Sequence, residues 1–155
     1  MQLAKYFGAT VTAVCNTKNV ELLKSLGADL VIDYTKQDFT KTDHIFDFVF
    51  DAVGKSSYGK CNPILNNNGI YISTELGRYS QNVFLALTTP IFSSKKVLFP
   101  IPTICKDDVI FLKELVVAGK FKPVIDRQYS LDQIVDAYKY VESGQKIGNV
   151  LITIT

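Results

Sequence analysis

Few of the residue types that perform acid–base or nucleophilic chemistry are placed in this sequence where they could act together. Asp47 and Asp51 lie four residues apart in an alternating run that is typical of a strand, which puts both carboxylates on one face. No histidine or hydroxyl is spaced to join them in a Ser–His–Asp or paired-carboxylate arrangement. We therefore expect structural or solvated roles for both, and catalytic residues stay unassigned.

The residues that could ligate zinc are the single histidine, His44, and the three cysteines, Cys15, Cys61 and Cys105. Their spacings match neither a zinc ribbon nor a disulfide framework, and cysteines used in this way are typical of a reducing compartment. Cys15 closes a predicted buried strand, where cysteine behaves as a small hydrophobic residue. We expect no metal site, an unreactive Cys15 and a cytoplasmic protein.

The elements that must position any site alternate along the chain. Short apolar and β-branched runs predict strands at residues 10–15, 30–33, 46–51, 69–74, 96–99 and 149–154. Apolar positions at helical spacing predict helices at residues 19–26, 58–65, 81–87, 107–118 and 131–141. We interpret residues 66–69 as a turn and expect Pro90 to close the helix at 81–87. The alternation predicts an α/β fold with a doubly wound, mostly parallel sheet.

The composition bounds the partners. The 155 residues are 47% hydrophobic and 21% charged, which is typical of one globular domain with a core. A net charge of +2 is too small to indicate nucleic acid or an anionic membrane surface as a partner. Since no apolar run approaches the roughly 18 residues of a membrane span, we predict that neither a nucleic acid nor a membrane is a partner.

Specific motifs run along nearly the whole chain: QLAK with GA in residues 2–9, LGADLVIDY in 26–34, FDFVFDAVG in 46–54, NNNGIYIS in 66–73, AGKFKPVID in 118–126 and GQKIGNVLITI in 144–154. In order and spacing they resemble the quinone oxidoreductase-like branch of the medium-chain dehydrogenase/reductase superfamily. That superfamily includes the zinc-containing alcohol dehydrogenases. The resemblance implies a Rossmann-like domain that binds a nicotinamide dinucleotide.

The sequence departs from that family in one important respect. It contains no G-x-G-x-x-G, the loop whose backbone N–H groups hold the pyrophosphate at a helix N-terminus. We expect residues 1–155 to be a partial dinucleotide-binding domain that keeps the family's carboxy-terminal helices and strand. Its first strand, Gly-rich loop and amino-terminal GroES-like catalytic domain are expected to be absent. Tight cofactor binding and activity are therefore not expected of this chain alone.

The residues that follow the first predicted strand bear on the choice of cofactor. In a dinucleotide-binding domain an acid at this place binds the ribose 2′-hydroxyl of NAD, whereas this chain has Asn16, Thr17 and Lys18. No carboxylate in this run repels a 2′-phosphate, and Lys18 offers a cation. This favours NADP(H) in the intact protein. The alternative for Lys18 is a solvated lysine in the first turn of a helix.

The resemblance adds further cofactor contacts. It implies that the ring of Tyr34 lies beside the 2′-phosphate. It implies that strand-end residues line the cofactor crevice, namely Val53, Gly54, Ser73 and Thr74. Near the carboxy terminus, Lys146 and Asn149 would reach the cofactor. Each also has an ordinary structural interpretation, as a loop tyrosine, a strand-end turn or a polar turn.

The implied activity of the intact protein is hydride transfer to or from a carbonyl, a quinone or an activated alkene. The alternatives are a non-catalytic assembly module, or the same fold used for another ligand. Without a first strand, residues 10–15 and 46–51 would each present an unpaired edge, to be closed on each other or by another chain. Residues 95–99 fit the strand that pairs between subunits in the family. We predict a homodimer or higher oligomer.

Overall fold

The computed structural model describes residues 1–103 and 105–154, and the chain divides into two compact units. The terminal unit comprises residues 1–11, 25–29 and the described part of 104–155. The central unit comprises residues 12–24 and 30–103. In both units parallel strands are joined through helices, which confirms the predicted α/β class.

The first strand pair of the central unit is β1 (Thr12–Cys15) against β2 (Leu30–Asp33). The two strands are parallel, with Cys15 opposite Asp33. Because a tight turn cannot join parallel neighbours, the chain crosses over through η1 (Thr17–Asn19) and α2 (Val20–Ser25). The carboxyl ends of β1 and β2 therefore lie beside each other.

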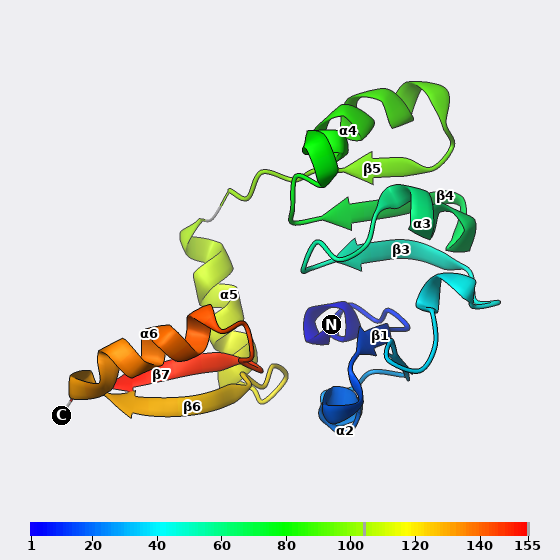
Figure 1. The fold of residues 1–155 in the computed structure, drawn as a ribbon. Helices are drawn as coiled ribbons and strands as arrows, with labels where there is room; N and C mark the ends of the chain where they lie inside the picture. Colours follow the sequence, from blue (N-terminus) through cyan, green and yellow to red (C-terminus); the bar gives the residue numbers. More distant parts are fainter. Residues whose placement is uncertain (104, 155) are drawn as a thin grey trace. The chain divides into compact units, whose positions relative to one another are not determined.

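The second sheet of the central unit has three parallel strands in the order β3 (Phe46–Asp51), β4 (Leu65–Ser73) and β5 (Lys96–Leu98). They lie side by side in Figure 1 and point the same way. A short helix, η2 (Phe39–Lys41), precedes β3. The crossovers are α3 (Tyr58–Cys61) with η3 (Asn62–Ile64), and η4 (Arg78–Ser80) with α4 (Gln81–Phe92).

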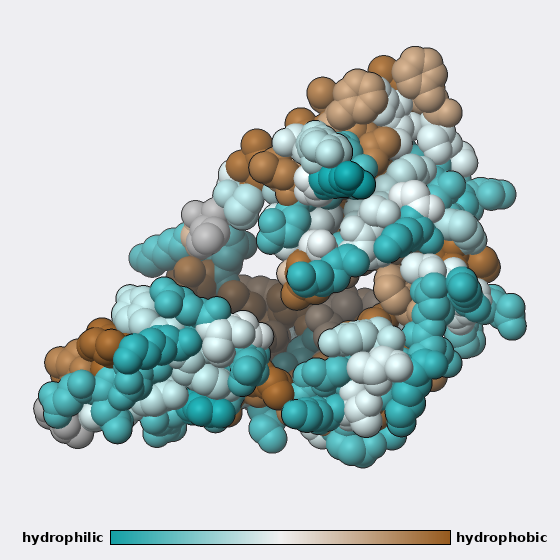
Figure 2. All heavy atoms as spheres, viewed as in Figure 1, coloured by the Kyte–Doolittle hydropathy of each residue, from teal (hydrophilic) through white to brown (hydrophobic). Residues whose placement is uncertain are grey.

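The core of the central unit lies between this sheet and its crossover helices. Its fully buried members are Cys61, Ile64, Leu65, Tyr71 and Val97. Partly buried apolar side chains pack around them, including Phe46 and Val49 from β3 and Leu85 and Ala86 from α4. The outer face of α4 is different, since Phe84, Leu87 and Ile91 are exposed. Figure 2 shows apolar side chains gathered at the surface over this helix.

The terminal unit contains α1 (Gln2–Tyr6), α5 (Lys106–Val117), β6 (Ile125–Ser130), η5 (Leu131–Gln133), α6 (Ile134–Glu142) and β7 (Asn149–Thr153). β6 and β7 form a parallel pair, and α6 is the helix that joins them. The rings of Tyr6 and Phe7 pack against Phe111 at 5.8 and 6.2 Å between centroids. Gln2 exchanges two hydrogen bonds of 2.8 and 2.9 Å with the backbone of Lys122. These contacts attach α1 to the segments around α5.

Three local predictions were wrong. The helix predicted at 58–65 ends at Cys61, and after the short helix η3 the chain already enters β4 at Leu65. The run 66–69 belongs to β4, not to a turn, because the strand accommodates it as a bulge: Phe46 lies opposite Leu65, whereas Phe48 lies opposite Ile70. Helix α4 also runs past Pro90 to Phe92. A proline in the last turn removes only one backbone hydrogen bond, the one to the Ala86 oxygen, so the helix can continue for two more residues.

The number of strands and their pairing also differ from what the sequence predicted. Strand β6 was not predicted, because four of the six residues of IDRQYS are polar and the segment lacks the apolar run that marks a buried strand. Within residues 1–103 and 105–154, β1 pairs only with β2 and β3 only with β4. Direct closure of these two strands on each other is therefore not what the molecule adopts.

Candidate functional site

A buried carboxylate organises the carboxyl ends of β1 and β2. Asp33 accepts hydrogen bonds from the Thr17 hydroxyl at 2.6 Å, and from the hydroxyl and backbone N–H of Thr35 at 2.7 and 3.0 Å. The Thr17 hydroxyl, followed by that of Thr35, holds the pKa of Asp33 below its ordinary value. The Lys36 ammonium lies 3.8 Å from the same carboxylate. Asp33 is therefore charged at neutral pH, and the Thr17 hydroxyl is turned toward it.

A carboxylate at this edge of the sheet was not predicted from the sequence. The preference for NADP(H) was predicted from the residues that follow β1, whereas Asp33 ends the neighbouring strand. The signal was available, because parallel pairing of β1 with β2 places Cys15 opposite Asp33 and so brings that side chain next to Thr17. The absence of an acid in the sequence after β1 does not mean that this edge of the sheet is free of negative charge.

The other residues predicted here lie at the same strand ends. The Tyr34 backbone N–H donates to the Cys15 oxygen at 2.9 Å, which fixes the half-exposed tyrosine beside β1. Lys18 is exposed and forms no ion pair within the described part of the chain. The Asn16 side-chain oxygen is buried and has no hydrogen-bond partner among the described residues. A buried acceptor without a donor is costly, and the Asn82 side-chain oxygen is the other such atom among the described residues.

A second group of predicted residues follows β3 and β4. Val53 is exposed, and Gly54 has φ +64°, where an added Cβ would come within 2.4 Å of the Glu75 side chain. Ser73 is 2% exposed, and its hydroxyl accepts from the Glu75 N–H at 3.2 Å. The exposed Thr74 is attached to β3 by an N–H bond to the Asp51 oxygen at 3.2 Å. Ser73 is thus a structural group here, whereas Val53, Gly54 and Thr74 lie at the surface.

Asp51 holds the loop that carries Val53 and Gly54. Its buried carboxylate accepts from the Ser56 N–H at 2.9 Å, from the Tyr71 hydroxyl at 3.2 Å, and from the N–H groups of Val53 and Lys55 at 3.3 Å. Burial, together with this negative charge, raises the pKa of Tyr71 above its ordinary value. Asp51 has the structural role that the sequence favoured.

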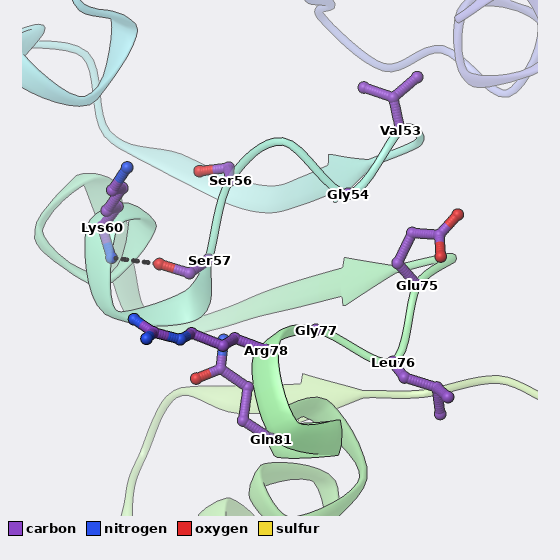
Figure 3. A pocket seen from close by; sticks show the side chains of 10 residues that line it. All are labelled: Val53, Gly54, Ser56, Ser57, Lys60, Glu75, Leu76, Gly77, Arg78 and Gln81. Carbon is purple, nitrogen blue, oxygen red and sulfur yellow. Dashed lines mark hydrogen bonds between the residues drawn. The ribbon is translucent and has the colours of Figure 1, made fainter.

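A cleft of about 670 Å³ lies between the loops that follow β3 and β4 (Figure 3). Val53 and Gly54 line it together with residues that the sequence did not single out, whereas Ser73 and Thr74 do not line it. The further lining residues are Ser56, Ser57, Lys60, Glu75, Leu76, Gly77, Arg78 and Gln81.

Lys146 and Asn149 belong to the terminal unit, where Lys146 lies in the loop between α6 and β7 and Asn149 begins β7. The Asn149 backbone and side-chain N–H groups both donate to the Val124 oxygen, at 2.8 and 3.2 Å. The Lys146 ammonium donates to the Gly148 oxygen at 3.2 Å. The Ile147 N–H donates to Asp126 at 2.6 Å, which is the main reason that the pKa of this carboxyl is lowered. The loop is therefore held closely against the segment that leads into β6.

Comparison with known proteins shows where this fold and these strand ends belong. Residues 26–152 match the sequence profile described as "Zinc-binding dehydrogenase". The chain belongs to the zinc-binding dehydrogenase family. No group of three or more His, Cys, Asp or Glu side chains that could hold a metal occurs among the described residues of this family member. The described residues therefore do not fit the zinc ion of the family's name.

Relatives in the family are reductases. Over 98% of its length the chain is 38% identical to the "2-methylene-furan-3-one reductase" of Solanum lycopersicum, and the match covers 36% of that protein. Over 98% of its length it is also 31% identical to the "NADPH-dependent alkenal/one oxidoreductase, chloroplastic" of Arabidopsis thaliana, and that match covers 36% of the relative. The chain thus spans well under half the length of these two relatives.

Solved structures support the fold. The quinone oxidoreductase from Coxiella burnetii superposes with a TM-score of 0.83 at 24% identity, over 99% of this chain and 48% of that one. A cobalt- and zinc-bound alcohol dehydrogenase from Pyrobaculum aerophilum gives 0.76 at 26% identity, over 98% of this chain and 45% of that one. The chain therefore has the Rossmann-like fold of the cofactor domain in these enzymes, as predicted. No helix among the described residues is long and apolar enough to cross a membrane.

Proposed function

We propose that this chain is the cofactor part of an NADP(H)-dependent oxidoreductase that transfers hydride to or from a carbonyl, a quinone or an activated alkene. Family membership supports the reaction class, and one relative of 31% identity is named as NADPH-dependent. The nicotinamide ring supplies the hydride chemistry, while the protein binds and orients it.

The observation that carries the proposal is the unpartnered Asn16 oxygen at the carboxyl end of β1. In a doubly wound sheet, ligands bind outside the carboxyl ends of the strands. A ribose hydroxyl would give this buried acceptor the donor that it lacks. Thr17, Lys18 and Tyr34 at the same edge would hold the remainder of the adenosine end, and Val53 and Gly54 the part that lies beyond β3.

The charges at this edge favour a 2′-phosphate despite the carboxylate of Asp33. That carboxylate already accepts hydrogen bonds from Thr17 and Thr35, and the Lys36 ammonium lies 3.8 Å away. Lys18 adds a second cation that is free of ion pairs within the described residues. Lys18 and Lys36 together carry two positive charges, and Asp33 carries one negative charge, so the net charge at this edge is positive and favours a phosphate group.

In the full-length protein, Lys18→Ala should reduce the preference for NADPH over NADH. An exposed cation acting on a phosphate contributes about 1 kcal/mol, so we expect a loss of about fivefold in the ratio of the kcat/KM values. Lys41→Ala, which removes an equally exposed cation from η2, should leave that ratio unchanged. Equal kcat/KM values for the two cofactors in the unmodified protein would contradict the proposal.

The 155-residue polypeptide by itself should bind NADPH weakly. It has no Gly-rich phosphate loop, and Lys18 in water supplies only a screened attraction. Calorimetric titration should give a dissociation constant well above the micromolar range. A micromolar or tighter constant would contradict this expectation, and titration of an unrelated anion in parallel separates nucleotide recognition from simple charge attraction.

We also propose that the chain forms a dimer or higher oligomer. In the part of the chain that the structure describes, β1, β3 and β5 each have one neighbour, which leaves an unpaired edge on each. Phe48 and Phe50 on β3 are half-exposed, with their rings 6.5 Å apart. Sedimentation velocity at low micromolar concentration should show an oligomer. A compact monomer under these conditions would refute the proposal.

A further inference from the structure

The cleft between the loops after β3 and β4 has a chemical character of its own. Two cationic side chains and two serines line it, whereas Glu75 is the single carboxylate among its lining residues. In the view of Figure 3, Lys60, Ser57 and Arg78 lie on one side of the cleft and Glu75 on the other. Cation and hydroxyl donors gathered on one wall are the groups that bind anionic oxygen.

Neither cation on that wall is neutralised by the protein. Among the described residues, Lys60 and Arg78 form no ion pair. The Arg78 guanidinium instead lies 5.0 Å from the centre of the Tyr79 ring and donates to the Tyr79 hydroxyl at 3.4 Å. An uncharged partner orients a guanidinium and leaves its charge available.

The loop that carries Arg78 is held in an unusual conformation. Gly77 has φ +73°, and Tyr79 and Ser80, which follow Arg78, have φ +54° and +57°. Two consecutive left-handed residues with side chains are strained, and such strain persists only where the surroundings impose it.

Asn82, which is 2% exposed, imposes this shape on the loop. Its side-chain N–H donates to the Glu75 oxygen at 2.8 Å, and its backbone N–H donates to the Leu76 oxygen at 3.1 Å. A Cβ on Gly77 would come within 2.9 Å of the same side-chain nitrogen. The Arg78 backbone is thus fixed before any ligand arrives, and a preformed site loses less entropy on binding.

The segment that carries Ser57 and Lys60 is fixed as well. The Ser56 N–H is bound to the buried Asp51 carboxylate at 2.9 Å, and the Ser57 hydroxyl caps α3 by accepting from the Lys60 N–H at 3.4 Å. Lys60 therefore leaves the first turn of a short helix whose start is anchored to β3. Both cations project from backbone segments that hydrogen bonds hold in place.

We infer that this cleft is a binding site for a small organic anion, whose carboxylate or phosphate group lies between Lys60 and Arg78. The volume of about 670 Å³ is in the range of small-molecule pockets. Val53 and Gly54, which the proposed function gives to the cofactor, also line this cleft, so the anion site adjoins the proposed cofactor site. Its test uses no nicotinamide nucleotide, so its failure and that of the proposed function are distinguishable.

The test is a two-dimensional NMR titration of the ¹⁵N-labelled chain with inorganic phosphate and, separately, with acetate, at constant ionic strength. We expect saturable shifts in the backbone signals of Ser56, Ser57, Lys60, Gly77 and Arg78. Saturation by phosphate alone assigns a phosphate ligand, and saturation by acetate assigns a carboxylate. Saturation of these signals by neither anion overturns the inference.

Matched variants separate a defined site from general charge attraction. Loss of a charge-assisted hydrogen bond should make Arg78→Gln and Lys60→Gln weaken anion binding by about tenfold each. Lys55→Gln makes the same charge change on a neighbouring exposed residue that does not line the cleft, and should alter binding by less than about twofold. Arg78→Lys, which keeps the charge, should restore part of the loss. Equal weakening by all three glutamine variants would overturn the inference, and each ligand-free spectrum checks that the variant is folded.

Discussion

Replacing Tyr71 by alanine should lower the free energy of unfolding by about 4 kcal/mol. The side chain is 0% exposed, and it packs in the cluster with Cys61, Leu65 and Val97. Its removal leaves a cavity and takes one donor from the buried Asp51 carboxylate, so two costs add. The measurement is the urea midpoint followed by circular dichroism, with Tyr138→Ala as the control because Tyr138 is 65% exposed on α6. If both variants lose the same stability, Tyr71 is not part of a packed core.

The phenylalanine variant isolates the Tyr71 hydroxyl and its proton. Tyr71→Phe should cost only about 1 kcal/mol near neutral pH, since the ring remains and one hydrogen bond is lost. The pKa of Tyr71 is raised in the folded state, mainly by burial. As pH rises past the unfolded value of about 10, the unfolded chain therefore loses this proton first and unfolding is favoured.

It follows that the stability contributed by the Tyr71 hydroxyl is present below about pH 10 and is lost as the pH rises further. We expect the difference between the unmodified chain and Tyr71→Phe to shrink, and then to reverse, at alkaline pH. The other tyrosines are common to both proteins and cancel in the comparison. A difference that is constant across this range would show that Tyr71 ionises with an ordinary pKa.

Gly148→Ala should cost about 3 kcal/mol, the second large effect that we expect. Gly148 has φ +113°, and an added Cβ would come within 2.5 Å of the Val124 oxygen. That oxygen cannot move away freely, because Asn149 donates two hydrogen bonds to it. The strain should also shift the NMR signals of Lys146 and Asn149, which flank this position.

Gly144 provides the control for conformation alone. It has φ +68°, but an added Cβ would meet no heavy atom within 4 Å. Gly144→Ala should therefore cost only the left-handed conformation, about 1 kcal/mol. Urea midpoints of the two variants compare the steric and conformational effects directly. Equal losses would show that the contact with Val124 is relieved without cost.

The sequence predicted the strands best where apolar, β-branched residues end abruptly at polar ones. Strands β2 and β3 have the predicted bounds, 30–33 and 46–51, because an aspartate ends each run. The extension of β4 through residues 66–69 could not be predicted, since three asparagines and a glycine are typical of a turn. Only tertiary contacts keep them in the strand, among them the bond from the Asn66 amide to Asp47 on β3.

The candidate sites show the same division. Asn16, Lys18 and Tyr34 could be placed from the sequence because each directly follows a predicted strand. The carboxylate of Asp33 and the cleft could not, because they depend on which strands are neighbours. Lys60 and Arg78 lie on different crossover segments, and they come together only because β3 pairs with β4.

The parallel pairing of the strands has a consequence for how this chain folds. Every strand pair that the structure describes is parallel, so each joins segments separated by a helical crossover. None of these pairs can begin as a local hairpin. The entropy of closing a long loop must be lost before the first interstrand hydrogen bond forms, which is the property that slows the folding of non-local topologies. Helices such as α5 and α6 are the elements that can form from local contacts.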